Sequence, residues 1–596
     1  MRLTLFALGF ALCLPSSVPA QQVADTVAPE VDSSLSSFGA ISEAAQAALE
    51  KKQAGIPTTA NDWMIAAANP LAVEAGTEVL RDGGTAADAM VAVQAVLGLV
   101  EPQSSGLGGG AFLVWYDASS GEITSLDGRE TAPLAVTPTL FQTDDGEPMG
   151  FWDAVVGGRS VGTPGTPRLM EETHARWGNS EWAGLFETAI GLAEDGFVVS
   201  ERLASSIEGG AERLQTFGRT ADYFLPDGSA LQAGDILVNE DYADTLRLIA
   251  AHGADIYYEG PIADDIVATV RTAAGNPGVL SATDLAIYNV IERDPVCVPY
   301  RSLEVCGMGP PSSGALTVGQ ILGTLDRYDL AEMGPEDVEA WRLIGDASRL
   351  AFADRGRYMA DSDFVPMPTE GLTSAPYLDE RAALLAGDTA LAEVTAGEPE
   401  WDHAMLWADD ESIELPSTSH ISIVDQYGNA LSMTTTIENG FGSRLMVRGF
   451  LLNNELTDFS FRTQRDGIPI ANRIEPGKRP RSSMAPTIVL EEGQPRLVIG
   501  SPGGSRIIGY VAQAIIAHVD WGMDIQQAVS MPHLVNRFGA YDLEEDTNAT
   551  SLEEPLKELG FEVNIRDLNS GLHAIAVSET LSGGADPRRE GIALGE

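Results

Sequence analysis

The sequence has few cysteines, few positive charges and no long apolar run after its first residues. Its three cysteines and seven scattered histidines lack the spacing of metal ligands, so neither a metal nor a cofactor is expected. Lys and Arg number 36 against 87 Asp and Glu, a formal net charge of −51. Such a surface repels nucleic acid and anionic membranes. No later stretch approaches 18 uninterrupted apolar residues, so no membrane span is predicted.

The N-terminus has the three parts of a secretory signal. Arg2 supplies a positive charge, "LTLFALGFALCL" is an apolar segment too short to span a bilayer, and "VPA" offers small residues for cleavage after Ala20. We therefore expect residues 1–20 to be a signal peptide and the mature protein to be periplasmic or secreted.

Removal of this signal leaves two cysteines, Cys297 and Cys306. They flank "VPYRSLEV", which is predicted to form a hairpin. An oxidising compartment favours a disulfide, whereas the alternative is a pair of free buried thiols. Spacing alone does not choose between the two.

Helical and strand patterns alternate irregularly along the chain. Two helices are predicted around the stop at Gly83-Gly84, and paired strands follow in "GGGAFLVWYD" and "GEITSLDGRE". Residues 165–285 are mainly helical, residues 335–359 form a long helix, and strands dominate from residue 418 onward. The lack of regular βαβ alternation argues against a Rossmann fold or a barrel. It favours helices packed on a sandwich of mostly antiparallel sheets.

A predicted hairpin rich in Ser and Thr occupies residues 415–437, "LPSTSHISIVDQYGNALSMTTTI". If "DQYG" is the turn, Thr418 lies opposite either Thr435 or Thr436 across the ladder. An ordinary threonine-rich strand explains this pattern by itself. The preceding acidic segment, "WADDESIELPS" at residues 407–417, is predicted to be exposed and mobile.

Several motifs in one order resemble the γ-glutamyltransferase family, the γ-glutamyl transpeptidases and glutathione hydrolases. They are "AAANPLAVEAG", "GLGGGAF", "DGRETAP", the hairpin, "LLNNELTDFS", "PGKRPRSSMAPTIV" and "GSPGGSRII". The similarity covers most of the chain from about residue 60. It implies an α+β fold, the four-layer αββα sandwich of the N-terminal-nucleophile hydrolases.

The resemblance also implies that the precursor cuts itself between Ser417 and Thr418. The products would be a large chain, residues 21–417, and a small chain, residues 418–596, which associate as a heterodimer. Thr418 would be the nucleophile and its new α-amine the general base. The resemblance assigns Thr436 to orienting this nucleophile, and the backbone N–H groups of Gly503 and Gly504 to an oxyanion hole.

The same resemblance implies a site for a γ-glutamyl group, which carries an α-carboxylate and an α-ammonium. The carboxylate partners would be Arg129, Ser482 and Ser483, and the ammonium partners Glu455 and Asp458. The acyl donor would be glutathione-like, and the acceptor an amino acid, a peptide or water.

The sequence departs from the family pattern at Glu438, where many members have Asn. Together with Glu455 and Asp458 it would place up to three carboxylates near one ammonium. Either one of them is protonated, or Glu438 points away and Asn439 replaces it.

The segment between Asp458 and Ser482 is also short and has no clear lid tyrosine, which favours hydrolysis over transfer. Two alternative functions remain: an acylase of the same fold that cleaves glutaryl or other acyl amides, and an uncleaved, inactive binding protein.

Overall fold

The structure is a computed structural model that describes residues 21, 38, 39, 41–403 and 405–596. The predicted signal peptide lies outside the described residues. Within the described ranges, no helix is long and apolar enough to cross a bilayer.

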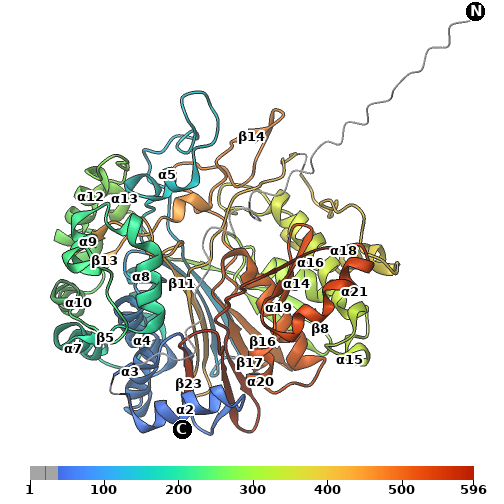
Figure 1. Ribbon diagram of the computed structural model, residues 1–596, viewed down its shortest axis with the longest axis horizontal. Coiled ribbons are helices and arrows are strands. Elements are labelled where there is room, and N and C mark those ends of the chain that lie inside the picture. The colour runs from blue at the N-terminus through green and yellow to red at the C-terminus, as the bar shows by residue number, and fades with distance from the viewer. Residues whose placement is uncertain (1–20, 22–37, 40, 404) are drawn as a thin grey trace, which may run out of the picture.

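Two seven-stranded sheets form the centre of the molecule (Figure 1). The first sheet has the order β23-β2-β10-β11-β3-β4-β7, and the second has the order β1-β22-β21-β17-β16-β9-β8. Every neighbouring pair in these two sheets is antiparallel.

The strands of the first sheet are β2 (Met64–Ala67), β3 (Gly110–Asp117), β4 (Glu122–Gly128), β7 (Ile291–Arg293), β10 (Ser419–Val424), β11 (Ala430–Thr436) and β23 (Ile592–Gly595). The strands of the second sheet are β1 (Thr58–Ala60), β8 (Val296–Tyr300), β9 (Leu303–Gly307), β16 (Thr487–Glu491), β17 (Gln494–Gly500), β21 (His573–Val577) and β22 (Leu581–Ala585). In both sheets, strands from the C-terminal third of the chain lie between strands from its earlier part.

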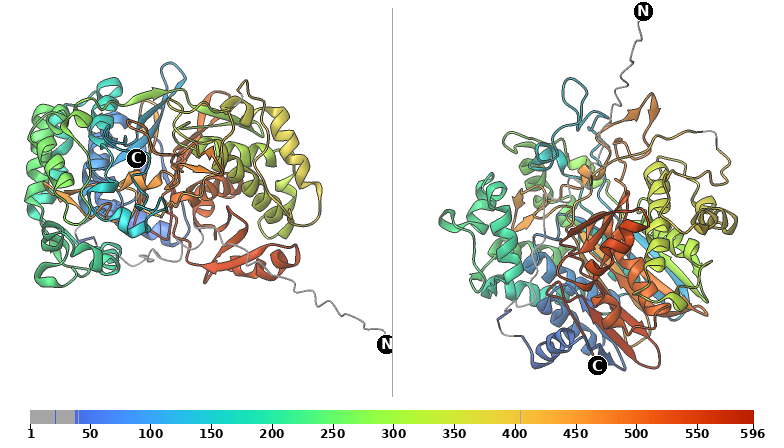
Figure 2. Two further views of the ribbon diagram at one scale, coloured as in Figure 1. Left: turned by 90° about the horizontal axis from the view of Figure 1, so that it is seen from above. Right: turned by 45° about the vertical axis from the view of Figure 1, so that its right-hand side comes forward.

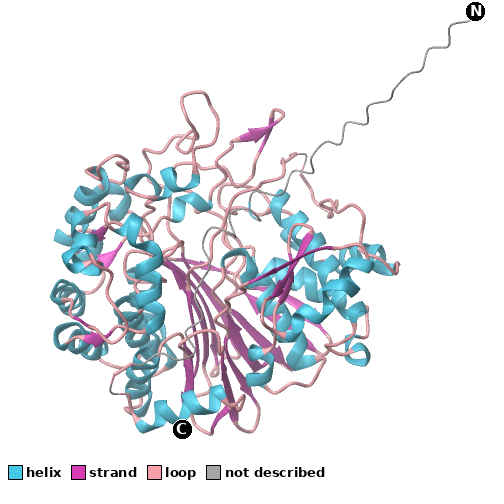
Figure 3. Cartoon of the chain, in the orientation of Figure 1, coloured by secondary structure: helices cyan, strands magenta, loops and turns pink. Residues whose placement is uncertain are grey.

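Helices cover the outer face of each sheet (Figure 1). On one side lie α2 (Glu43–Gln53), α3 (Pro70–Arg81), α4 (Ala86–Val100), α6 (Thr166–Trp177), α7 (Glu187–Asp195), α8 (Glu201–Leu214), α10 (Glu240–His252) and α12 (Pro261–Arg271). On the other lie α14 (Gly314–Leu325), α16 (Val338–Tyr358), α18 (Ala375–Ala383), α19 (Ile507–Val519) and α20 (Ile525–Ser530). Figures 2 and 3 show the same helix–sheet–sheet–helix arrangement from other directions and by element type. The predicted four-layer sandwich is confirmed.

The two faces of the β10–β11 hairpin differ in polarity, as the alternation of a strand requires. Ile421 and Ile423 pack in the apolar core that the first sheet forms with α3 and α4. Between them, Ser422 faces the second sheet and donates a hydrogen bond to the carbonyl of His573 at 3.1 Å. This alternation fixes the register, because a shift of one residue would bury the serine in the apolar core.

The two helices that pack against this hairpin begin at side-chain caps. Asn69 accepts a hydrogen bond from the N–H of Leu71 at the start of α3. Thr85 and Asp88 form a capping box at the start of α4. Both helices end close to their predicted limits.

Cys297 and Cys306 face each other on the paired strands β8 and β9 and are joined in a disulfide. Glu304 lies close to both sulfurs, but the disulfide leaves no thiolate there to bind a metal.

Candidate active site

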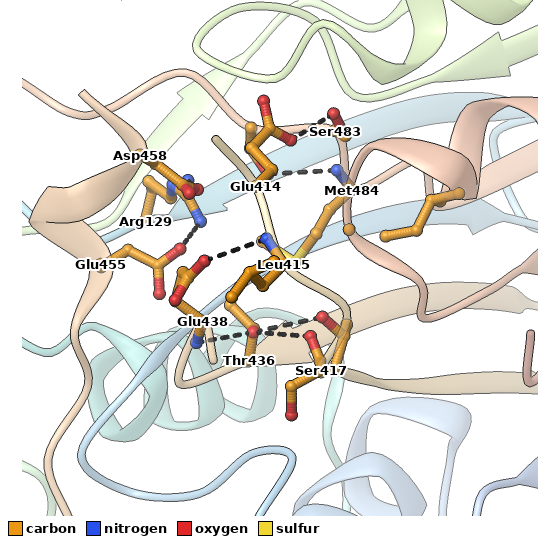
Figure 4. Close-up of a pocket in the computed structure, with 14 residues that line it drawn as sticks. Arg129, Glu414, Leu415, Ser417, Thr436, Glu438, Glu455, Asp458, Ser483 and Met484 are labelled. Carbon is orange, nitrogen blue, oxygen red and sulfur yellow. Dashed lines mark hydrogen bonds and ion pairs between the residues drawn. The ribbon is translucent and has the colours of Figure 1, made fainter. Parts of the chain in front are cut away.

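The hairpin places two threonine hydroxyls in contact in the lining of one pocket, which Figure 4 shows around Thr436. Ser419 pairs with Thr435, so the next step along the ladder aligns Thr418 with Thr436. The Thr418 hydroxyl donates to the Thr436 Oγ1 at 3.2 Å. Of the two registers that the sequence allows, the structure has the one that brings these two hydroxyls together.

The Thr436 hydroxyl also reaches the bond that is predicted to be cut. It donates to the carbonyl oxygen of Ser417 at 3.4 Å and accepts a hydrogen bond from the N–H of Glu438 at 2.9 Å. The Ser417 hydroxyl donates to the carbonyl of Gln103 at 2.8 Å, which holds the residue before the bond. The Thr436 side chain therefore touches both Thr418, the candidate nucleophile, and the Ser417 carbonyl that Thr418 would attack.

Glycines let other backbone segments approach these threonines. A Cβ on Gly109 would lie 1.9 Å from the carbonyl oxygen of Thr436, so the "GLGGGA" stretch allows β3 to meet the end of β11. Gly503 and Gly504 have φ angles of 137° and 56°, which glycine adopts without strain. Gly504 lines the pocket and lies against the carbonyl of Leu415.

Arg129 lies in the same pocket between two acids. It forms ion pairs with Glu455 and, at 2.5 Å, with Asp458, and it donates to the carbonyl of Arg481 at 2.9 Å. All three side chains are buried. Burial alone would lower the pKa of Arg129, but the two carboxylates outweigh burial and raise it.

If all were ionised, the acids around Arg129 would carry more negative charge than this one cation can balance. Burial is the main cause that raises the pKa of Glu438, Glu455 and Asp458 well above their ordinary values. Burial also raises the pKa of the neighbouring Glu130 to about 8. No sequence pattern singled out Glu130, although it follows Arg129 directly in "DGRETAP".

Glu438 points into the pocket, and Asn439 does not replace it. Glu438 accepts hydrogen bonds from the side chain of Asn454 and from the N–H of Leu415, whereas Asn439 binds Arg444. The raised pKa of Glu438 favours the alternative in which one pocket acid is protonated.

Ser482 and Ser483 also line the pocket. Ser482 Oγ accepts the N–H of Met484 at 3.1 Å. Ser483 Oγ donates to the carboxylate of Glu414 at 2.5 Å and accepts a hydrogen bond from Arg355 at 2.7 Å. The structure thus brings all ten predicted catalytic and binding residues to one region, and nine of them line the pocket.

The segment before the predicted cut is only partly exposed: Asp409 and Glu411 are exposed, as predicted, but its end is not. Glu414, Leu415 and Ser417 are buried in the pocket, and Asp410 forms a buried ion pair with Arg481 at 2.9 Å. The predicted exposure is therefore wrong for the end of this segment, because the buried Arg355 and Arg481 pair with its acids. Its mobility after a cut stays a prediction. Composition showed the acidic run but not the arginines, which lie far away in the sequence.

The Gamma-glutamyltranspeptidase family model matches residues 72–596. The chain is 37% identical over 550 residues to the glutathione hydrolase proenzyme of Bacillus subtilis (strain 168), covering 90% of this chain and 91% of that protein. It is 34% identical to the acylase ACY 1 proenzyme of Pseudomonas sp. (strain SE83), with coverage of 90% and 94%.

Among solved structures, the cephalosporin acylase from Bacillus halodurans superimposes with a TM-score of 0.80 at 25% identity, over 91% of this chain and 97% of that chain. Sequence and structure therefore agree along nearly the whole length: the chain belongs to the gamma-glutamyltranspeptidase family.

Proposed function

We propose that the protein is exported, cuts itself between Ser417 and Thr418, and then transfers γ-glutamyl groups from glutathione-like compounds to water or an amine. One observation carries the proposal: the Thr418 hydroxyl contacts Thr436, whose own hydroxyl reaches the Ser417 carbonyl. Family membership and the charged pocket beside these groups support it.

Maturation is an acyl shift followed by hydrolysis. The Thr418 Oγ adds to the carbonyl carbon of Ser417, the C–N bond breaks, and the nitrogen takes a proton to become the α-amine of Thr418. The resulting ester is hydrolysed by water, which frees the Ser417 carboxylate and the Thr418 hydroxyl. Thr436 assists by donating a hydrogen bond to the carbonyl oxygen, where negative charge develops.

Turnover uses the groups that the cut creates. A free α-amine has a pKa of about 7.7–8.0 and accepts the hydroxyl proton of the same threonine, which an amide nitrogen cannot do. The Thr418 Oγ attacks the γ-carbonyl of the substrate. The amine of the broken amide bond leaves with the proton that the α-amine had accepted, and a γ-glutamyl ester of Thr418 remains. The N–H groups of Gly503 and Gly504 stabilise the oxyanion, and such a donor is worth about 3 kcal/mol. Water or an acceptor amine then releases the acyl group.

Substrate recognition follows from the two charges of the γ-glutamyl group. Arg129, Ser482 and Ser483 offer donors to the α-carboxylate. Glu455 and Asp458 offer acceptors to the α-ammonium, and Asp458 Oδ1 has no hydrogen-bond partner among the described residues. An ammonium group at this point would satisfy that oxygen.

Similarity to the acylase supports a second candidate activity, the hydrolysis of glutaryl or other acyl amides. A glutaryl group lacks the ammonium and would leave the buried acids Glu455 and Asp458 without a partner. The γ-glutamyl proposal is therefore favoured, and the short segment after Asp458 favours water as the acceptor.

The deciding experiment is the intact mass of the purified protein under denaturing conditions, beside a Thr418→Ala variant. Two chains, residues 21–417 and 418–596, are expected from the wild type, and one chain is expected from the variant. The mature enzyme should then hydrolyse γ-glutamyl-4-nitroanilide at least about tenfold faster than glutaryl-4-nitroanilide, because the buried acids lose their cationic partner in the latter. A single uncut wild-type chain would favour the inactive binding protein.

A further inference from the structure

The carboxylate of Glu414 is held inside the pocket, three residues before the predicted cut (Figure 4). Ser483 Oγ donates to it at 2.5 Å, and Arg355 forms an ion pair with it. The same guanidinium donates to Ser483 Oγ at 2.7 Å and to Ser313 Oγ at 2.8 Å. A carboxylate therefore already occupies a site built from Ser483 of the pocket wall and from Arg355, which lines another cavity.

This arginine lies in a second cationic region that the residues before the cut neutralise. We define the tail segment as residues 409–417. Arg481 lies 2.9 Å from Asp410 and 3.9 Å from Glu414, both of which belong to the tail segment. The side chains of Arg355 and Arg481 are 3% and 1% exposed. Departure of the tail segment after cleavage would leave two buried guanidinium groups without these carboxylates.

Arg129 differs in this respect. Its carboxylate partners, Glu455 and Asp458, follow the cut and stay in place when the tail segment departs. Its charge is compensated in the cut and uncut chains alike. After the tail segment departs, Arg355 would lack the carboxylate of Glu414, whereas Arg129 would keep both of its carboxylates. Because a buried unpaired charge is costly, an anion would bind more favourably beside Arg355.

The tail segment also contacts the opposite wall of the pocket. The N–H of Leu415, the residue after Glu414, points at the carboxyl group of Glu438 at 3.5 Å. The segment thus offers a carboxylate to Ser483 and an N–H to a pocket acid, as an α-amino acid would. Burial alone would raise the pKa of Glu414, but Arg355 and Arg481 outweigh burial, so that its pKa lies below the ordinary value.

We propose that Arg355 and Ser483 bind the α-carboxylate of the γ-glutamyl substrate in the mature enzyme, and that Glu414 occupies this carboxylate site in the uncut chain. The inference rests on the proposed function and adds Arg355 to its specificity-determining residues. It also makes the tail segment an internal substitute for the substrate, which closes the site until the chain is cut.

The first test compares two anilides that differ only in the carboxylate, γ-glutamyl-4-nitroanilide and 4-aminobutyryl-4-nitroanilide. In the matured Arg355→Gln variant, kcat/KM for the first should fall by at least about 30-fold, mainly through KM, with a small change for the second. Arg355→Lys should recover part of the loss. Arg349→Gln is the matched control, because Arg349 lies in the same helix as Arg355 but pairs with Asp346, which lies outside the tail segment.

An equal loss on both anilides, or no loss on either, would overturn the proposal for Arg355. A wild-type enzyme that is cut but turns over neither anilide would instead refute the proposed function. The two failures are therefore distinguishable.

A second test uses the mature wild-type enzyme and needs no arginine variant to fold. The peptide Asp-Asp-Glu-Ser-Ile-Glu-Leu-Pro-Ser, residues 409–417, should inhibit competitively against γ-glutamyl-4-nitroanilide. Gln at the position of Glu414 should weaken inhibition at least about tenfold. Gln at the position of Glu411 should not, because Glu411 pairs with Arg465 at the surface. Equal inhibition by all three peptides, or by none, would contradict the substitute role of Glu414.

Discussion

Replacement of Thr436 by Val should slow self-cleavage about 100-fold without unfolding the chain. Val keeps the shape of the side chain but removes the donor to the Ser417 carbonyl and the acceptor of the Glu438 N–H. A donor aimed at a developing oxyanion is worth about 3 kcal/mol, which corresponds to about 100-fold in rate. The orphaned N–H adds a stability cost of about 1–3 kcal/mol, which a protein of this size tolerates.

The assay is the fraction of cut chain against time, measured by denaturing mass spectrometry. Thr435→Val is the matched control: it is the neighbouring residue, it is fully buried, and its hydroxyl has no hydrogen-bond partner among the described residues. It should mature at the wild-type rate, and Thr436→Ser should stay within about tenfold because it keeps the hydroxyl. The reasoning fails if both Val variants slow the cut equally, or if Thr436→Val matures normally.

Three further outcomes follow from the buried acids and the disulfide. Glu438→Gln resembles the protonated acid and should leave KM for γ-glutamyl-4-nitroanilide at pH 7 within about threefold, as initial rates would show. Burial raises the pKa of Glu101 from 4.5 to about 7. The stability that the protonated Glu101 gives the folded chain is therefore fully present below pH 4.5 and is lost as the pH rises through about 7. In the uncut Thr418→Ala chain, the free energy of unfolding measured with urea should fall by up to about 3 kcal/mol between pH 4.5 and 8. Adding Glu101→Gln should abolish this fall, because the amide does not ionise. Replacement of Cys297 and Cys306 together by Ala should lower that free energy by about 2–3 kcal/mol without changing kcat/KM, and an unchanged urea midpoint would contradict it.

Local patterns predicted the elements of the fold well. The caps of α3 and α4 and the turn at Asp425 each depend on neighbouring residues. The hairpin pattern narrowed the partner of Thr418 to two residues. It could not choose between them, because the choice depends on the other strands that pair with the hairpin.

The charged site was predicted less completely, for a physical reason. Arg129 and Asp458 were assigned to opposite ends of a substrate, yet in the uncut chain they bind each other across 329 positions. Arg355 was missed because its partners, Glu414 and Ser483, come from two other parts of the chain. Ion pairs of this kind depend on tertiary packing, and no local spacing encodes them.

The strand order has a consequence for the lifetime of the enzyme. Strands β10 and β11 follow the proposed cut, and they lie between β2 and β3, which precede it. In the second sheet, β16 from after the proposed cut pairs with β9 from before it. Two cut chains would therefore be interleaved, and they could separate only by breaking ladders in both sheets. Cleavage would also turn an intramolecular association into a bimolecular one and remove its high effective concentration. The cut enzyme should persist through slow unfolding, and once unfolded it should not regain activity on dilution, whereas the uncut chain keeps the connection needed to refold.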